Sequence, residues 1–174
     1  PHVRMDDLDG HTDGLIAFTG ASEGAVTRLL AEGQQNHAEA LLDRLQGLFP
    51  ERLYIELARR GNEVEERAEA ALVDLAYARD LPLVATNPAN FAEPHMHKAH
   101  DAMLCIAGST HVDAEERARS NPESFVKTYH MMEEAFADLP EAVQNTLVVA
   151  QRCAYAPPYR KPILPSLAGD LEGE

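Results

Sequence analysis

Apolar and polar positions alternate most clearly in the middle of the chain. The residues from Leu53 to Leu57 alternate with period two, which is typical of a strand. Apolar residues then recur at helical spacing from Val64 to Ala78. The apolar run Leu81–Thr86 is too short for a helix and is predicted as a second strand. Such a βαβ unit requires parallel strands, so chemistry is expected beyond their carboxyl ends, at residues 58–62 and 87–91.

The same pattern occurs once more before this unit. Leu15–Thr19 reads as a buried strand between glycines, and the turn 20–24 after it has neither a Walker lysine nor a GxGxxG phosphate loop. A helical face that Pro50 ends comes next. Its members are Ala38, Leu41, Leu42, Leu45, Leu48 and Phe49. Strands are thus expected from residues 15, 53 and 82, each followed by a helix, and this threefold βα repeat indicates the α/β class.

Beyond the repeat the pattern becomes helical and then irregular. Asp113 with Glu116 resembles a capping box that starts a short helix. Thr128 is placed to cap a further helix, and Pro140 is placed to start a last one. The proline-rich stretch 155–165 is predicted to be extended, and the acidic tail after it is predicted to be disordered.

Length and charge narrow the classes of function. The chain has 174 residues, enough for one domain with a substantial core. Its formal net charge is −14, from 29 acidic and 15 basic residues, whereas a protein that grips DNA through phosphates needs clustered Lys and Arg. Little DNA binding is therefore expected from this chain alone. No apolar run reaches membrane-spanning length and no signal peptide is recognised, so we expect a cytoplasmic protein without membrane contact.

Two further features concern the cysteines and the start of the chain. Cys105 and Cys153 each lie on an apolar helical pattern, so both are expected to be buried, reduced thiols. The chain begins at Pro1 without an initiator methionine. Two origins stay open, a processed product and a fragment of something longer.

The densest group of potential metal ligands is EPHMHKAHD, which contains His95, His97 and His100. In a helix started by Pro94, His97, His100 and Asp101 share one face, whereas His95 points elsewhere. The spacing differs from the i, i+4 histidines of HExxH zinc sites. Two interpretations stay open: a shifted metal site built from the three histidines, and the favoured one, in which His100 is hydrogen-bonded and the other two are solvated.

Several stretches, taken in order, resemble one family. They are LIAFTG, LYIELARRG, ALVDLAYARDLPLVATN, AHDAMLCIA, FADLPEAVQNTLVVAQRC and KPILP. From Gly14 to Pro165 they resemble the amino-terminal PHP (polymerase and histidinol phosphatase) domain of the alpha subunit of bacterial replicative DNA polymerase III, and the link beyond it. The resemblance implies an α/β fold, the later portion of a distorted (β/α)7 barrel. Its opening strands would precede Pro1, and the polymerase palm would follow well after Glu174.

The resemblance also divides the chain into three parts. Residues 1–110 correspond to the later part of the PHP barrel. Residues 111–156 correspond to a helical segment that links the barrel to the polymerase core, and residues 157–174 to a Pro-rich linker with an acidic tail.

Metal-binding PHP domains hold divalent ions at strand ends, where the ions activate water for phosphoester cleavage. In this chain Arg60 stands where the family pattern can have a His before the glycine, and Pro88 and Asn90 replace the Asp and His of an Asn-Asp-x-His pattern. Arginine cannot ligate a cation, proline has no donor side chain, and asparagine is a poor zinc ligand. We therefore expect no catalytic residue and no metal in this segment. Arg60 is expected to replace the metal's charge by pairing with an acidic neighbour such as Glu56.

The leading hypothesis is a non-catalytic structural and protein-interaction segment of a DNA-directed DNA polymerase, whose nucleotidyl transfer uses Mg ions bound elsewhere. Its expected partners are the rest of the alpha subunit and a proofreading exonuclease subunit. The alternative is a PHP phosphoesterase that uses Zn or Mn, either a 3′–5′ exonuclease or a pyrophosphatase. A third hypothesis is an unrelated stand-alone α/β domain. Because three strands cannot close a barrel, exposed sheet edges and an apolar face predict self-association of the isolated chain.

Overall fold

A sheet of three parallel strands, in the order β1-β2-β3, lies at the centre of the molecule. The computed structural model describes residues 3–160. The strands are β1 (Ala17–Phe18), β2 (Leu53–Leu57) and β3 (Leu83–Ala85). Ala17 pairs with Leu53, and Ile55 pairs with Leu83. The predicted parallel α/β arrangement is confirmed for these strands, although β1 and β3 are shorter than predicted. Closure into a barrel stays a prediction.

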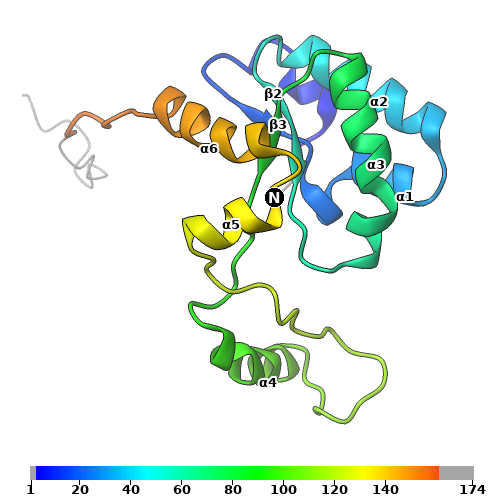
Figure 1. Ribbon diagram of the computed structural model, residues 1–174, viewed down its shortest axis with the longest axis vertical. Coiled ribbons are helices and arrows are strands. Elements are labelled where there is room, and N and C mark those ends of the chain that lie inside the picture. The colour runs from blue at the N-terminus through cyan, green and yellow to red at the C-terminus, as the bar shows by residue number, and fades with distance from the viewer. Residues whose placement is uncertain (1–2, 161–174) are drawn as a thin grey trace, which may run out of the picture.

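Three helices lie together beside this sheet (Figure 1). They are α1 (Ala25–Ala31), α2 (Gln35–Leu48) and α3 (Glu63–Ala78), and two short 3₁₀ helices, η1 (Met5–Leu8) and η2 (Ala21–Glu23), precede them. Their buried apolar residues join those of the strands in one core. The helix predicted before Pro50 is α2. The helix predicted from Val64 is α3, which Asn62 caps by accepting a hydrogen bond from the Val64 amide at 2.8 Å.

The last of the helices packs against β3, on the side away from α1, α2 and α3, and the helix before it packs against this last helix (Figure 1). They are α5 (Tyr129–Ala135) and α6 (Pro140–Arg152). Both were predicted correctly. The hydroxyl of Thr128 accepts a hydrogen bond from the Met131 amide at 3.3 Å and so caps α5, and Pro140 is the first residue of α6.

Helix α6 covers the outer edge of β3. The side-chain amide of Asn145 donates a hydrogen bond to the Leu83 carbonyl at 2.7 Å. The guanidinium of Arg152 donates to the Tyr54 hydroxyl at 3.0 Å, and Tyr54 is also packed edge-on by Phe18. We expected both edges of the sheet to be exposed. The β3 edge is instead protected, because α6 packs against it and supplies a hydrogen-bond donor to the Leu83 carbonyl. Strand β1 forms the opposite edge, and Phe18 there is 39% exposed.

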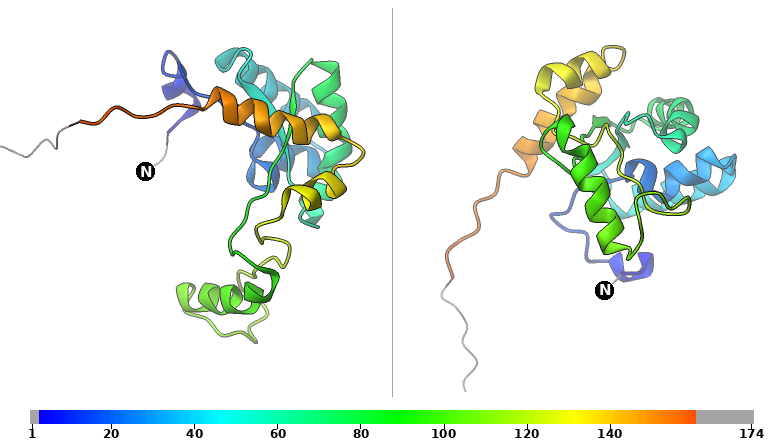
Figure 2. Two further views of the ribbon diagram at one scale, coloured as in Figure 1. Left: turned by 60° about the vertical axis from the view of Figure 1, so that its left-hand side comes forward. Right: turned by 90° about the horizontal axis from the view of Figure 1, so that it is seen from below.

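A separate lobe, residues 92–124, extends away from the sheet and its helices (Figure 2). It contains the 3₁₀ turn η3 (Pro94–Met96), the helix α4 (His97–Ala107) and the loop that follows. We name it the α4 lobe. A single parallel bridge between Phe91 and Phe125 closes its base. The side chain of Asn87 reinforces this base by donating to the Phe125 carbonyl and accepting from the Lys127 amide.

The prediction of a helix from the pair Asp113 and Glu116 is wrong, because the loop between α4 and α5 contains no helix. Arginine side chains instead bind backbone carbonyl groups on both sides of Asp113. Arg119 donates to the Ala114 carbonyl at 3.1 Å, and Arg117 donates to the Val112 carbonyl at 3.0 Å. These side-chain bonds offer the backbone an alternative to helical pairing.

The prediction for the cysteines is half right. Cys105 in α4 is buried with 4% exposure, whereas Cys153 is exposed at the carboxyl cap of α6. Helix α6 ends at Arg152, so the thiol that follows lies past the apolar face that suggested its burial. Both thiols are free rather than joined in a disulfide.

Within residues 3–160, no helix combines the length and apolar character needed to cross a membrane. The described part of the proline-rich stretch, 155–160, has no regular structure, as predicted. The remainder of that stretch and the acidic tail lie outside the described residues.

Candidate functional site at the carboxyl ends of the strands

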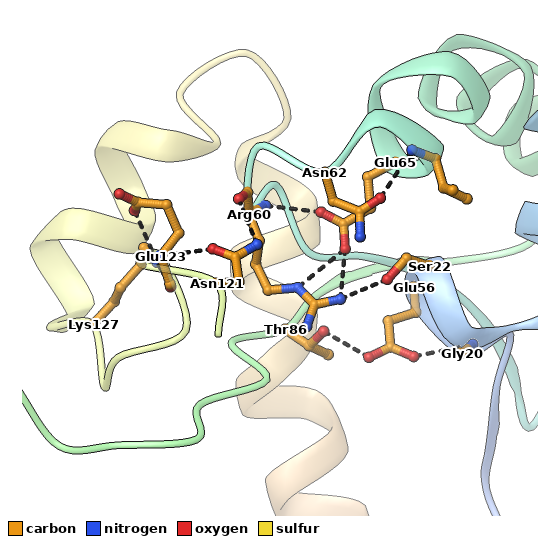
Figure 3. A network of polar contacts seen from close by, with 11 residues as sticks. Gly20, Ser22, Glu56, Arg60, Asn62, Glu65, Thr86, Asn121, Glu123 and Lys127 are labelled. Carbon is orange, nitrogen blue, oxygen red and sulfur yellow. Dashed lines mark hydrogen bonds and ion pairs between the residues drawn. The ribbon is translucent and has the colours of Figure 1, made fainter. Parts of the chain in front are cut away.

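The loop after β2 sends two neighbouring arginine side chains in different directions. Arg59 and Gly61 both have left-handed backbone conformations, with φ of 49° and 66°. This sharp turn connects β2 to α3. The Arg59 side chain reaches the corner between α5 and α6. The Arg60 side chain reaches α3 and η2, as Figure 3 shows.

Arg60 forms a buried ion pair with Glu65 in the first turn of α3. Its Nη2 and Nε atoms donate to one Glu65 oxygen at 2.7 Å and 3.1 Å, and its backbone amide donates to the other at 2.8 Å. The same Nη2 donates to the Ser22 hydroxyl at 2.6 Å. The two side chains are only 11% and 6% exposed. A fixed positive charge is thus bound at this strand end, with its carboxylate partner beside it.

Arg60 has an acidic partner, as expected, but the partner is not Glu56. The Glu56 carboxylate accepts hydrogen bonds from the Thr86 hydroxyl at 2.6 Å and from the Gly20 amide at 3.0 Å (Figure 3). Glu56 therefore joins the ends of the three strands to one another, since Gly20 follows β1 and Thr86 follows β3. Glu65 is better placed for Arg60 because it comes from the helix that begins directly after the turn.

The loop after β3 carries Pro88 and Asn90 and meets a turn of the α4 lobe. Asn90 is exposed, and its backbone amide donates to the Ser124 carbonyl at 2.8 Å. The same turn reaches Arg60, because the Asn121 side chain donates to the Arg60 carbonyl at 3.1 Å. Pro88 is half-buried. The turn from Asn121 to Ser124 thus contacts the loops after both β2 and β3.

The Arg59 side chain makes more hydrogen bonds than any other side chain of this region. Its guanidinium donates to both oxygens of Glu69, to both oxygens of Asp138 and to the Ala135 carbonyl, and it lies 4.6 Å from the centre of the Phe136 ring. The hydrogen bond to Asp138, followed by those to Glu69, raises the pKa of Arg59. In return the guanidinium lowers the pKa of the Asp138 carboxyl. These contacts fix the α5–α6 corner to the end of β2.

A cleft of about 690 Å³ lies beside Arg59, between α3 and the residues before α6. Its acidic lining residues are Glu65, Glu66, Glu69, Asp74 and Asp138, with Arg59 as the basic one. A cleft with this excess of carboxylates repels a polyanion such as DNA.

The three histidines of the α4 lobe do not share one set of contacts. The imidazoles of His97 and His100 contact Ser120, through its carbonyl at 3.1 Å and its hydroxyl at 2.7 Å. Both rings pack against Phe91. His95 instead lies in solvent beside Glu93. The shared helical face of His97 and His100 was predicted correctly, whereas the solvated state expected for His97 is wrong because the loop folds back over it.

Asp101 also binds the loop that folds over this face of α4. One of its carboxylate oxygens accepts from the Ser120 amide at 2.9 Å, and both accept from Arg117 at 2.8 Å. Arg117 is the main cause that lowers the pKa of Asp101, and the Ser120 amide adds to it. The face shared by His97, His100 and Asp101 thus binds the loop at Ser120, and Asp101 also binds it at Arg117.

The strand-end residues do not fit the divalent metal that the family resemblance implies. Arg60 brings a cation rather than a ligand, Pro88 has no donor atom, and the Asn90 side chain is exposed. Within residues 3–160, no three His, Cys, Asp or Glu side chains gather in a group able to hold a metal ion.

Sequence reasoning missed several residues of this network, above all Glu65 and Ser22. Asn62 and Glu65 have the N-x-x-E spacing of a capping box, which could have identified Glu65 as a residue that folds back toward the preceding turn. Its carboxylate reaches the Arg60 amide, two residues before the cap. No sequence signal identifies Ser22 or Asn121, since both meet Arg60 only through the tertiary fold.

Comparison with known proteins gives a consistent result. Residues 1–60 match the PHP domain family. The whole chain aligns with the DNA polymerase III subunit alpha of Caulobacter vibrioides, with 45% identity over 175 residues that cover 15% of that protein. The corresponding subunit of Pseudomonas aeruginosa is 37% identical over 152 residues, 87% of this chain and 13% of that protein. That of Rickettsia bellii is 34% identical over 167 residues, 96% of this chain and 14% of that protein. The chain thus spans a small part of the length of the curated relatives it matches.

Proposed function

Because the chain belongs to the family of DNA polymerase III alpha subunits, we propose that it is a non-catalytic structural and protein-interaction segment of such a subunit, formed by the later portion of the PHP domain and the segment after it. The observation that carries the proposal is the buried contact among Arg60, Glu65 and Ser22. It occupies the strand end at which the family resemblance puts a metal-binding histidine.

Electrostatics support this proposal. A divalent cation bound beside Arg60 would face a guanidinium that stays protonated at every physiological pH. Repulsion between like charges is strong where water is scarce, and both Arg60 and Glu65 are almost fully buried. Arg60 therefore balances the Glu65 charge that a metal would otherwise balance, and a guanidinium has no lone pair with which to bind a metal.

The packing of the α5–α6 corner supports a structural role. Arg59 binds this corner to the end of β2, and Asn145 and Arg152 bind α6 to β3 and to Tyr54. Through these contacts the segment that follows the PHP portion has a defined position against the sheet. A scaffold that positions neighbouring parts of a polymerase subunit needs such a fixed arrangement of its helices and its sheet.

The proposal includes partners and location. The rest of the alpha subunit would be the permanent partner, and nucleotidyl transfer with Mg would be carried out by residues outside this segment. A proofreading exonuclease subunit is a candidate second partner. The net charge of −14 and the acidic cleft argue against DNA as a direct partner of this segment. A DNA polymerase subunit would act in the cytoplasm.

Calorimetric titration of the chain with zinc and with manganese tests the proposal. We expect no binding with a submicromolar dissociation constant, and such binding would overturn the proposal. A labelled single-stranded DNA incubated with the chain and manganese, with a chelator as the control, tests the phosphoesterase alternative. Chelator-sensitive cleavage that follows the chain through purification would favour that alternative.

Two variants test the structural part of the proposal. Arg60→Met leaves Glu65 buried without a counter-charge, so it should lower the free energy of unfolding by about 3–5 kcal/mol. The double variant Arg60→Met with Glu65→Leu removes both charges and should recover most of that loss. Recovery would show that the loss in Arg60→Met comes from the unpaired Glu65 charge, so the two residues act as one buried unit.

A further inference from the structure

The hydroxyl of Thr27 is buried without a hydrogen-bond partner among the described residues. Thr27 lies in α1 and is 1% exposed. Buried hydroxyl groups in folded proteins almost always have a partner, from the protein or from an ordered water, because losing the contact with bulk water is unfavourable. Thr27 therefore requires a partner that residues 3–160 do not supply.

Thr27 lines a small cavity together with three carboxylate residues, Glu56, Glu65 and Glu69, and four apolar residues, Ala21, Leu57, Ala58 and Leu72. The space open to the centre of a water molecule in this cavity is about 10 Å³. A single water needs roughly 10–15 Å³ by that measure, and it needs two to four polar partners. The cavity has room for one water and for nothing larger.

The chemistry of the lining residues identifies the ligand. Ionised carboxylates only accept hydrogen bonds, so the ligand must donate toward Glu56, Glu65 or Glu69 and accept from Thr27. A bound anion would be repelled by the carboxylates. A bound cation could not accept the Thr27 proton, and Glu65 and Glu69 are already neutralised by Arg60 and Arg59. Water satisfies every requirement, because it donates twice and accepts as well.

We propose that this cavity binds one ordered water, which accepts from the Thr27 hydroxyl and donates to the surrounding carboxylates. Glu56 and Glu65 stand in separate contact groups in Figure 3, one reaching Gly20 and Thr86, the other Arg60 and Ser22. The water joins these groups to the Glu69–Arg59 pair. The polar contacts at the three strand ends thereby form one connected network. This inference does not depend on the function proposed above.

A crystal structure of the chain at high resolution tests the proposal directly. We expect a density peak about 2.7–3.2 Å from Thr27 Oγ1 and from at least one carboxylate oxygen of the cavity. A cavity without density would overturn the proposal. So would a peak with several oxygen contacts near 2.4 Å, because that distance is typical of a bound cation.

The thermal midpoint of unfolding provides a second, independent test. Thr27→Val keeps the shape of the side chain but removes the hydroxyl. If the hydroxyl binds the water, the midpoint should fall by roughly 2–4 °C, the shift expected for one lost hydrogen bond in a chain of this size. If the hydroxyl has no partner, its removal should leave the midpoint unchanged or raise it, and either result contradicts the proposal.

Discussion

Arg59 binds both carboxylate oxygens of Asp138, at 2.6 Å and 2.8 Å, although the two residues are 79 positions apart in the sequence. The same guanidinium binds Glu69 in α3 and lies over the ring of Phe136. One side chain therefore connects the end of β2, the helix α3 and the α5–α6 corner. The left-handed φ of 49° at Arg59 is unfavourable for a residue other than glycine, so these contacts must also maintain the backbone conformation.

Arg59→Lys should lower the free energy of unfolding by about 2 kcal/mol. Lysine keeps the charge, but it lacks the planar group that binds two carboxylates and packs on Phe136 at the same time. Urea unfolding of the chain measures the loss.

Arg67→Lys is the control for this prediction. Arg67 pairs with Glu63 on the exposed surface of α3, and such pairs contribute about 0–1 kcal/mol. Equal losses in the two variants would show that the geometry at Arg59 has no special importance.

Asn145→Ala should destabilise the chain by about 1–3 kcal/mol, because the Leu83 carbonyl at the edge of β3 loses its donor. Asn145→Asp has nearly the same shape but no donor when ionised, so it should be at least as damaging. Gln144→Ala, at the exposed neighbouring position, should change little. Thermal unfolding of the three variants measures these effects, and an unaltered midpoint in Asn145→Asp would contradict the assigned contact.

Acidification should weaken the α4 lobe through Asp101. The Arg117 guanidinium, with the Ser120 amide, lowers the pKa of this carboxyl in the folded protein. The unfolded pKa is about 3.9. The contribution of Asp101 to stability is therefore complete above that pH and is lost as the pH falls from there toward the folded pKa. Urea midpoints measured between about pH 6 and pH 3 follow this loss.

Asp101→Asn provides the reference for the pH series. The amide should make the protein less stable near neutral pH and should reduce the dependence of stability on pH in the acidic range. Asp138, whose pKa Arg59 also lowers, remains in both proteins and contributes equally to the two curves. Parallel curves for the original and the variant chain would show that Asp101 is not the titrating group.

Self-association of the isolated chain stays a prediction, and the structure narrows its location. Strand β1 is the sheet edge opposite to the one that α6 covers, and Leu15 and Phe18 are exposed there. Sedimentation velocity should show a concentration-dependent oligomer that Phe18→Lys weakens. Tyr159→Lys, at an exposed tyrosine far along the chain, should leave it unchanged. A monomer at high concentration, without binding of an apolar dye, is the contrary result.

The elements with local signals were predictable from the sequence. The alternation at Leu53–Leu57, the cap at Thr128 and the proline at the start of α6 each encode a structure within a few neighbouring residues. The helical spacing of His97 and His100 likewise predicted their common face. Such features depend on short-range sterics and hydrogen bonding, which a sequence displays directly.

The features that failed depend on how the turns and loops fold, which no periodic pattern in the sequence encodes. The capping pattern at Asp113 was overridden by arginines that bond the loop carbonyls and by the salt bridge from Arg117 to Asp101. Glu56 was named as an example of an acidic partner for Arg60, but the turn after β2 points the Arg60 side chain at Glu65. Ser22 and Asn121 joined the site only through the tertiary fold. A single sequence does not display these pairings.

The position of α6 in the chain has a consequence for biosynthesis. The donor to the outer edge of β3 is Asn145, and the group that binds the Tyr54 hydroxyl is Arg152, 98 residues after Tyr54. While the ribosome is still translating this region, the nascent sheet has neither contact. The sheet therefore acquires both contacts only after the codons for α6 have been read and the helix has left the exit tunnel. In that interval the unpaired edge of β3 is open to pairing with other chains, and a chaperone that covers it would prevent aggregation of the growing polypeptide.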